Sequence, residues 1–340
     1  MRAPRKDEGA VLLTTLLIMS FMASLAVTIS GDVRFAVRRT VAVEDTLQAA
    51  NYLSGAESYA LAYVRDNFAE LEDPAFNALL LAGQSATLPI PGGAITLSLS
   101  DGSNCLNPAG VVGGEPVEDS ADGRTAPQNR LINLMTLRGI PNFEAQSLVF
   151  ALVDWQDPDN NVSPGGAEDA HYMLGTPAYR SADTPITTVS EMRAVRGMTA
   201  ERFAAIAPWM CVTDTGPATL NVNTLTPAHA PLLAASLGDF QTETTALDLL
   251  SRRPPEGWTG GEEGTLKEAL SGIGVGDIPD NVGTAPSALR VDLAVTFRGS
   301  TRRARLYTTV DGTLLSRERG DAIGPTVEDL EENLGRGGRR

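Results

Sequence analysis

A run of 22 residues without a charged side chain, residues 10–31, constrains the fold of this chain more than any other feature. At the rise of an α-helix such a run extends roughly 33 Å, which is enough to cross the ~30 Å hydrocarbon core of a bilayer. Arg2, Arg5 and Lys6 precede the run, and basic residues beside a span favour the cytoplasmic side. The chain is therefore predicted to cross a membrane once, with its bulk on the far side.

The helix is predicted to continue beyond the apolar run. A cleaved signal peptide is the alternative, but the run is long for one and no clear Ala-x-Ala cleavage site follows it. No proline occurs between Pro4 and Pro74. In that interval small and apolar residues recur at helical spacing, at Ala49, Leu53, Ala56, Ala60 and Tyr63. We expect one helix of roughly sixty residues, apolar in its first part and amphipathic in its second.

Two widely separated strand patterns predict an antiparallel sheet with a large insertion. Residues 87–102 are typical of a β-hairpin around a Pro-Gly-Gly turn, and residues 290–318 alternate apolar and polar side chains around further turns. About 190 residues lie between the two patterns, which is too long for a loop without structure. The predicted fold class is α+β: a long N-terminal helix and an antiparallel sheet, with a large, mainly helical domain inserted between the strands.

The inserted segment repeats a helix–glycine–helix pattern. Gly139 in "LRGI" and Gly197 in "VRGM" occupy equivalent places in the two copies. Helix pairs of this kind occur in DNA-binding modules, but the formal net charge of −15 would repel a phosphate backbone. We therefore interpret the glycines as tight turns between packed helices, and we expect no nucleic acid partner.

The chain has two cysteines, Cys105 and Cys211. In a reducing compartment they would be unrelated thiols, whereas in an oxidising compartment a pair with none left over favours one disulfide. The N-terminal segment favours the oxidising compartment.

An acidic segment, residues 154–172, contains the strongest candidate site. Counting from Asp157, positions 1, 3, 5 and 12 are Asp157, Asp159, Asn161 and Glu168. This is the ligand spacing of an EF-hand calcium loop, but position 6 is Val162, where the sharp turn usually requires glycine. We therefore predict a calcium loop that differs from an EF-hand, with Asp154 and Asp169 as further candidate ligands. The alternative, two carboxylates acting as acid and base in a hydrolase, is disfavoured because aromatic residues are only 5% of the chain.

The N-terminus resembles that of type IV pilins and pseudopilins, in which a short basic leader ending in glycine precedes the apolar helix. The resemblance implies cleavage after Gly9 and methylation of the new N-terminal residue, Ala10. Most members have glutamate at the fifth mature position, which here is Thr14. The member that lacks this glutamate is the minor pseudopilin K of the type II secretion system. Similarity to that family extends to "LVDWQDPDN", "GAEDAHY", "EMRAVRGMTAERF" and "TLNVNTLTP".

This resemblance carries several expectations. It implies a non-enzymatic, single-pass protein of the inner membrane with its bulk in the periplasm, located at the pseudopilus tip with minor pseudopilins I and J. Contact with secreted substrates or with the outer-membrane channel is a further expectation. It also implies structural calcium in the insert and a disulfide between Cys105 and Cys211. The alternatives are a minor pilin of a type IV pilus, serving adhesion or DNA uptake, and a membrane-anchored periplasmic hydrolase.

The expected domain organisation combines the sequence patterns with the pilin resemblance. The boundaries are 1–9 for the leader, 10–31 for the transmembrane helix, 32–105 for the pilin-like helix and first strands, 106–285 for the inserted helical domain, 286–318 for the pilin-like C-terminal strands and 319–340 for a flexible, frayed tail.

Overall fold

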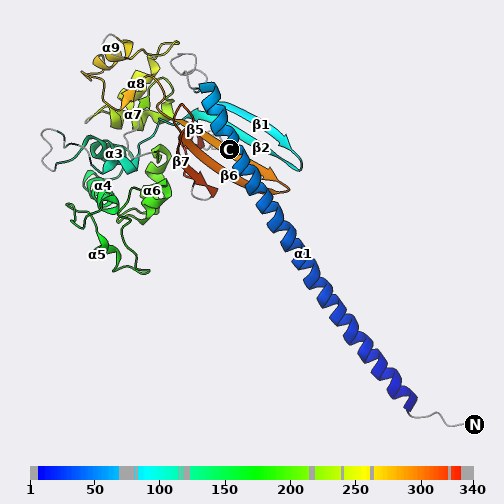
Figure 1. The fold of residues 1–340 in the computed structure, drawn as a ribbon. Coiled ribbons are helices and arrows are strands. Elements are labelled where there is room, and N and C mark those ends of the chain that lie inside the picture. The colour runs from blue at the N-terminus through cyan, green and yellow to red at the C-terminus, as the bar shows by residue number, and fades with distance from the viewer. Residues whose placement is uncertain are drawn as a thin grey trace, which may run out of the picture.

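One long helix projects from a two-part head (Figure 1). This computed structural model describes residues 7–68, 80, 83–113, 115, 117, 123–213, 219–238, 241–260, 264–320 and 323–330. Helix α1, Asp7–Phe68, confirms the predicted single helix and includes Gly9 and Ala10. Among the described residues, Ala10–Asn67 is the one helix long and apolar enough to cross a membrane. The basic cluster of Arg2, Arg5 and Lys6 lies outside the described residues.

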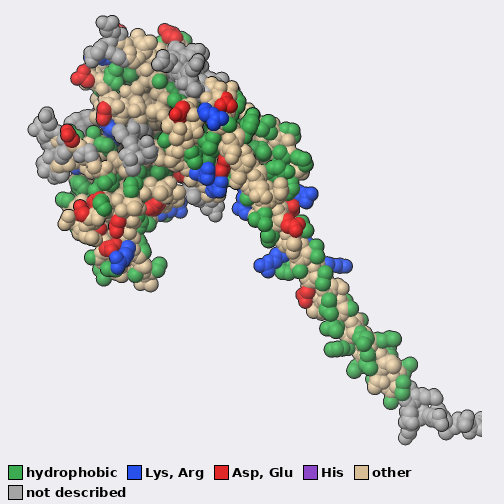
Figure 2. Space-filling model, in the orientation of Figure 1, with side chains coloured by type: hydrophobic (Ala, Val, Ile, Leu, Met, Phe, Trp, Pro, Cys, Tyr) green, Lys and Arg blue, Asp and Glu red, His purple; other side chains and the backbone are tan. Residues whose placement is uncertain are grey.

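The first half of α1 is a stalk without contacts to the head. Side chains of residues 10–44 are exposed, and burial begins at Asp45, where the helix reaches the sheet. Figure 2 shows the apolar end of this stalk as a run of green side chains, with blue basic side chains between that end and the head.

The predicted antiparallel sheet has five strands in the order β1-β2-β5-β6-β7. The strands are β1 Gln84–Ile90, β2 Gly93–Asp101, β5 Leu289–Phe297, β6 Ser300–Thr308 and β7 Leu314–Arg319. Strand β2 pairs directly with β5, so that Ile95 lies opposite Val295. The whole insert therefore leaves and re-enters the sheet between two neighbouring strands.

The second half of α1 covers one face of this sheet. Burial alternates along β5 because successive side chains of a strand point to opposite faces. The apolar side chains on the covered face include Val291 of β5 and Leu306 of β6. They form one core with Leu53, Ala60 and Val64 of α1. Because small residues dominate on α1, the helix backbone lies close to the strands.

An ion pair also links α1 to the edge of the sheet. Glu57 is only 3% exposed, and its carboxylate accepts two bonds from the Arg319 guanidinium at 2.8 and 2.5 Å. Arg317 lies 3.4 Å from the same carboxylate. Helix, sheet and edge strand β7 thus form one packed unit, which agrees with the predicted architecture.

The insert, residues 102–288, is mainly helical as predicted. Its elements are η1 Pro108–Val111, α3 Ala126–Leu137, α4 Asn142–Gln156, α5 Asp169–Tyr172, η2 Val189–Ala194, α6 Ala200–Ile206, η3 Ala207–Trp209, β3 Leu220–Asn221, η4 Pro227–His229, α7 Ala230–Ser236, α8 Glu243–Ser251, α9 Thr265–Ser271 and β4 Val282–Gly283. They surround two apolar cores, one centred on α3 and α4 and the other on α7 to α9.

The two helix–glycine–helix units are present. Gly139 and Gly197 have φ of 86° and 81°, a left-handed conformation that side chains disfavour. In the second unit the first helix is the 3-10 helix η2 instead of an α-helix.

The base of the insert is cross-linked where the chain leaves and re-enters the sheet. Cys105 and Cys211 form the disulfide, with their Cα atoms 5.7 Å apart. Beside it, the Asp101 carboxylate accepts bonds from Thr224 Oγ1 at 2.6 Å and Asn221 Nδ2 at 2.8 Å. Asn223 holds the adjoining turn through Trp258 and Thr284. Side-chain hydrogen bonds of the two asparagines therefore hold this part of the insert to the sheet and to its own loops.

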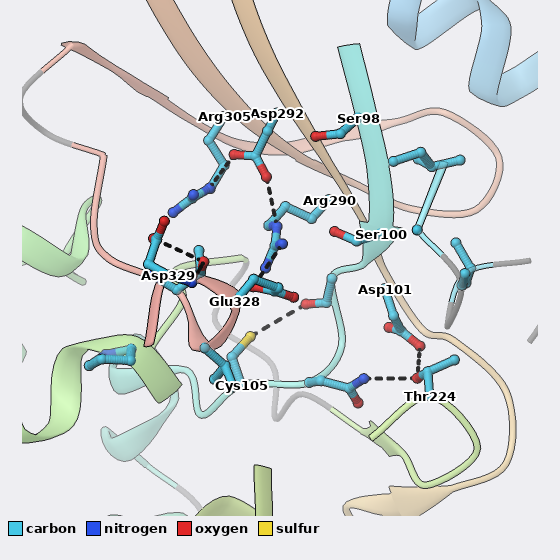
Figure 3. Close-up of a pocket in the computed structure, with 18 of the residues that line it drawn as sticks. Ser98, Ser100, Asp101, Cys105, Thr224, Arg290, Asp292, Arg305, Glu328 and Asp329 are labelled. Atoms are coloured by element: carbon cyan, nitrogen blue, oxygen red, sulfur yellow. Dashed lines mark hydrogen bonds and ion pairs between the residues drawn. The ribbon is translucent and has the colours of Figure 1, made fainter. Parts of the chain in front are cut away.

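The expectation of a frayed tail from residue 319 is wrong for residues 323–330, which are packed. Val327 is 3% exposed and belongs to the first core of the insert. The Glu328 carboxylate lies 3.1 Å from Arg290 of β5, and Arg305 of β6 donates to the Gly324 carbonyl at 2.7 Å (Figure 3). The segment therefore bridges sheet and insert, through partners far away in the sequence. Residues 331–340 lie outside the described residues.

Candidate metal centre

Asp154 in the last turn of α4 forms the buried floor of the acidic loop. It is 0% exposed, and both of its carboxylate oxygens accept from the Ser163 amide, at 3.2 and 3.1 Å. Burial nevertheless raises its pKa, against the hydrogen bonds that lower it. Asp154 therefore holds the loop backbone in place through Ser163 and adds a buried negative charge next to the loop.

Three carboxylates converge above Asp154. Asp157, Asp159 and Glu168 each offer an oxygen, and these three atoms lie within 4.8 Å of one another. Glu168 is 4% exposed, yet neither of its oxygens has a hydrogen-bond partner, and Asp157 Oδ1 is equally unpartnered. Buried charges are normally paired or bound to a metal. The sequence spacing therefore does bring Asp157, Asp159 and Glu168 together.

The electrostatics of this cluster disfavour full ionisation in the absence of a cation. Burial, followed by the charges of Asp154 and Asp157, raises the pKa of Glu168 to about 7. Burial also raises the pKa of Asp157, with further contributions from Asp159 and Asp154. Carboxylates this close repel each other unless a proton or a cation lies between them. Oxygen ligands of this kind suit a hard cation such as calcium.

The loop turns at its glycines, as the valine at position 6 suggested. Val162 is 61% exposed and Gly165 adopts φ of 82°. At Gly166 a Cβ atom would lie 2.1 Å from Asp154 Oδ2, so only glycine fits against the buried carboxylate. The following helix α5 has one turn, whereas an EF-hand loop lies between two full helices. The loop therefore differs from an EF-hand in the position of its turn and in the length of the helix that follows it.

The second helix–glycine–helix unit supports the loop from the side. Arg196, beside Gly197, donates from Nη1 to the Gly166 carbonyl at 2.6 Å. Its amide donates to the Tyr172 hydroxyl at 3.2 Å, and Tyr172 packs edge-on against Trp155 with ring centroids 5.2 Å apart. The two repeated units therefore share the task of holding one acidic loop.

The remaining predicted ligands have different positions. Asn161 is exposed, and its amide donates to Asp159 Oδ1 at 2.7 Å, which shapes the loop. Asp169 accepts from the amide and hydroxyl of Ser181, at 3.0 and 2.9 Å, and pairs with Arg180 at 3.2 Å. Asp169 is therefore engaged in holding the next segment of chain.

Sequence reasoning missed Asp183. Its charge raises the pKa of both Asp157 and Glu168, and its backbone has φ of 51°, unusual for a residue other than glycine. It lies beyond any calcium-loop spacing, so only the fold reveals that its charge acts on the cluster.

A second concave region lies at the junction of sheet and insert. This polar cavity of about 540 Å³ is lined by β2, β5, β6 and the C-terminal segment. In Figure 3 its charged side chains point toward one another, with Asp292 between Arg290 and Arg305 at 2.9 and 2.7 Å. Because these charges are paired within the chain, the cavity is a joint between the two parts of the head.

Comparisons with known proteins agree on one family. Residues 104–215 and 220–284 match two family models, both described as type II secretion system (T2SS), protein K. The chain is 30% identical over 323 residues to type II secretion system protein K of Aeromonas hydrophila, covering 92% of each chain. It is 29% identical to the Pectobacterium carotovorum protein of the same description, over 74% of this chain and 77% of the relative.

A solved structure shows the same fold. The similar chain comes from the crystal structure of the GspK-GspI-GspJ complex of the enterotoxigenic Escherichia coli type 2 secretion system, with a TM-score of 0.68 and 21% identity. The match covers 83% of this chain and 99% of the other. It confirms the predicted α+β architecture with its helical insert.

Proposed function

Because the chain belongs to the type II secretion system protein K family, we propose that it is the minor pseudopilin that caps the pseudopilus tip. In this role it helps to export folded proteins across the outer membrane. The observation that carries the proposal is the shape of the molecule, a bare apolar helix ending in a broad two-part head (Figure 1). The helix fits among parallel helices, whereas the insert blocks addition of a further subunit above the head.

Thr14 supports the tip position. A glutamate at this place would need a partner from a neighbouring subunit, because a charge in an apolar environment is costly without one. The Thr14 hydroxyl instead donates to the carbonyls of Ala10 and Val11 within its own helix, at 3.1 and 2.9 Å. A subunit at the tip, with no neighbour above, has no use for the charge.

The proposed setting is the inner membrane, with the head in the periplasm after cleavage behind Gly9 and methylation of Ala10. The disulfide at the base of the insert fits an oxidising compartment. The proposed partners are minor pseudopilins I and J, the counterparts of the chains named with GspK in the similar complex. Contact with secreted substrate or the outer-membrane channel would fall to the insert, which lies farthest from α1.

Capping is tested by two measurements. The part of the chain from Asp32 onward is expected to form a ternary complex with the soluble parts of pseudopilins I and J. A label on the insert is expected at one end of isolated pseudopili. Labels spaced along the filaments, or an absent complex together with normal secretion in a deletion strain, would reject capping.

We further propose that the acidic loop binds calcium and keeps the insert rigid. Three convergent carboxylates, two of them with unpartnered buried oxygens, support this assignment. Asp157, Asp159 and Glu168 would be direct ligands, while Asn161 and Asp154 would complete or support the site. Asp169, held by Ser181 and Arg180, is the weakest of the six candidates.

Thermal unfolding tests the calcium proposal. A ligand that binds only the folded state at 100 times its dissociation constant stabilises by about 2.7 kcal/mol. Calcium is expected to raise the melting temperature of the parent protein relative to chelator, and Asp157→Asn to remove this response. Asp277→Asn is the matched control, because this carboxylate of the insert is 95% exposed. The control variant is expected to keep the calcium response of the parent protein. A parent protein whose melting temperature does not change with calcium would contradict the proposal.

The alternative functions fit the site less well. A hydrolase would need its carboxylates and aromatic side chains open to substrate, but Glu168, Asp154, Trp155 and Tyr172 are all at most 6% exposed. A pilus role for adhesion or DNA uptake is disfavoured by relatives that are described as secretion-system proteins. The net charge of −15 also opposes binding of DNA.

A further inference from the structure

A group of basic side chains lies on α1 just beyond the apolar run. Arg34, Arg38 and Arg39 are all exposed, and within the described chain none of their side chains has a hydrogen bond or ion pair. The one acidic residue among positions 32–39 is Asp32, so this segment carries a net positive charge of 3 − 1 = 2. Figure 2 shows blue side chains standing off the stalk at this level. We call these three residues the basic collar.

The length of the apolar run sets the height of the collar above the membrane. With residues 10–31 in the hydrocarbon core, Arg34 lies about 4.5 Å beyond its edge, and Arg38 and Arg39 about 10–12 Å beyond it. The headgroup layer is roughly 5–7 Å thick on each side of a bilayer. The collar therefore begins inside the headgroup layer and ends just above it.

The direction of the side chains brings all three charges toward that layer. In an α-helix the Cα–Cβ bonds tilt toward the N-terminus, which here is the membrane side. Long basic side chains extend along this direction and place their charge at the polar interface. At 100° per residue, Arg34 and Arg38 share one face and Arg39 lies about 100° further round. The collar thus presents guanidinium groups over an arc of about 140° of the helix.

We propose that the basic collar binds the phosphates of anionic phospholipids in the leaflet that faces the head. Guanidinium groups pair with phosphate through two parallel hydrogen bonds, which gives the interaction geometry as well as charge. The collar would hold α1 at a fixed depth and keep the head, where burial begins at Asp45, about 21 Å beyond the edge of the hydrocarbon core. The inference rests on the membrane anchorage proposed above and goes beyond the assembly role.

The position of the collar also opposes the charge bias that orients the helix. Basic residues near a span favour the cytoplasmic side, yet three lie on the side of the head, equal in number to Arg2, Arg5 and Lys6. Removal of the leader at Gly9 would leave the collar as the only basic cluster beside the span. Binding to phosphates gives these charges a partner on the side where the fold requires them.

Lipid selectivity of the full chain tests this inference. The protein is reconstituted in vesicles of phosphatidylethanolamine and phosphatidylglycerol, and the lipids retained at the helix are quantified by electron paramagnetic resonance of spin-labelled lipids. We expect preference for phosphatidylglycerol that weakens with salt, because exposed charges are screened. Each basic residue near an anionic surface contributes about fivefold in affinity. Arg38→Gln with Arg39→Gln should therefore lower the preference by roughly 25-fold.

Two controls separate charge at the collar from charge in general. Arg302→Gln with Arg303→Gln removes a second adjacent, exposed pair, this time on β6 of the head, and should leave the preference unchanged. Arg38→Lys with Arg39→Lys keeps the charge and should retain most of the preference. Because all these side chains are exposed, tryptophan fluorescence of the insert and hydrogen exchange at β5 and β6 should both show unchanged unfolding of the head.

Three results would overturn the inference. Insertion of α1 without phosphatidylglycerol preference refutes the collar and leaves the anchorage intact. A collar variant that loses partner pseudopilins but keeps its lipid preference assigns the arginines to a neighbouring helix. Failure of α1 to enter the bilayer rejects the anchorage and the collar with it.

Discussion

The two parts of the head are held together in different ways. In the pilin-like part, the second half of α1 and strands β1, β2, β5 and β6 share one continuous apolar core, and most of its residues perform the same task. In the insert, short helices and irregular segments pack around two apolar cores and are also held at single points, namely a disulfide, a buried carboxylate network and an acidic loop. Because many similar apolar contacts stabilise the pilin-like part, its stability should tolerate single substitutions. The stability of the insert should depend more on particular residues.

The three tryptophans allow the two parts to be observed separately. Trp155, Trp209 and Trp258 all lie in the insert and are at most 6% exposed. Tyr52, Tyr59 and Tyr63 lie on α1. Tryptophan fluorescence therefore reports on the insert, while hydrogen exchange at β5 and β6 reports on the pilin-like part. The stalk makes no contacts with the head before Asp45, so the chain from Asp32 onward suits these measurements.

The largest effect is expected from the disulfide. Cys105 and Cys211 are 106 residues apart in sequence, and a loop of that length predicts about 4–5 kcal/mol by chain entropy, as a model-dependent upper figure. Cys105→Ser with Cys211→Ser should lower the denaturant midpoint of tryptophan fluorescence sharply and leave exchange in β5 and β6 nearly unchanged. An equal loss of protection in both parts would show that they unfold as one unit.

A matched pair of leucines tests whether ordinary packing differs between the parts. Leu306 of β6 and Leu249 of α8 are both 0% exposed, each within an apolar core. Leu→Ala at such sites costs about 2–5 kcal/mol. Leu249→Ala should shift the tryptophan transition and Leu306→Ala the exchange of the sheet. If each variant shifts both signals equally, the distinction between the two parts fails.

The same contrast explains how much of the fold the sequence could predict. The 62-residue helix and the strands of the sheet follow from periodicity, because every turn or pair of residues repeats the signal. The two-residue strands β3 and β4 are too short to form a pattern. The packed segment around Val327 was mistaken for a tail because its partners, Arg290 and Arg305, are separated from it by other elements.

The sequence could predict only those residues of the acidic site that lie close together in the chain. Spacing brought out Asp157, Asp159 and Glu168, which do converge. It could not reveal Asp183, which the fold brings in from a later segment, or the diversion of Asp169 to Ser181. Spacing identifies residues that share one turn of chain, whereas long-range packing decides which charges face them.

Gly166 offers the next test, because Gly166→Ala adds a single carbon atom, Cβ, at a crowded position in the insert. A Cβ there would lie 2.1 Å from the buried Asp154 carboxylate, and overpacking of this kind costs about 1–3 kcal/mol. Gly166→Ala should lower the tryptophan midpoint and weaken the calcium response together. Gly276→Ala, where no atom lies within 4 Å of the added Cβ, is the control. A Gly166→Ala protein with unchanged stability would show that the loop relaxes away from Asp154.

The smallest expected effect concerns the joint between the two parts. Burial alone would raise the pKa of Glu328, but the Arg290 guanidinium outweighs it and the pKa falls to about 2. A carboxylate whose pKa falls on folding stabilises the protein above its ordinary value of 4.5, and the contribution disappears as pH falls toward 2. The Glu328 side chain is 52% exposed, so solvent screening limits the effect to about 1 kcal/mol.

Glu328→Gln isolates this contribution. Burial lowers the pKa of His229 to about 4, so its neutral form stabilises the protein above pH 6.5, and that stability is lost as pH falls toward 4. This loss occurs in parent and variant alike, and because the Glu328 charge also raises the pKa of His229, the difference between their tryptophan midpoints reports the interactions of Glu328 with Arg290 and His229 together. The difference should be present at pH 6 and shrink as pH falls from 4.5 to 3, whereas Glu256→Gln, an exposed change in the insert, should give none. A constant difference would mean that the Arg290 pair does not help to join the sheet to the insert, and that the other contacts, such as Val327 packing and the Asp101 network, hold them.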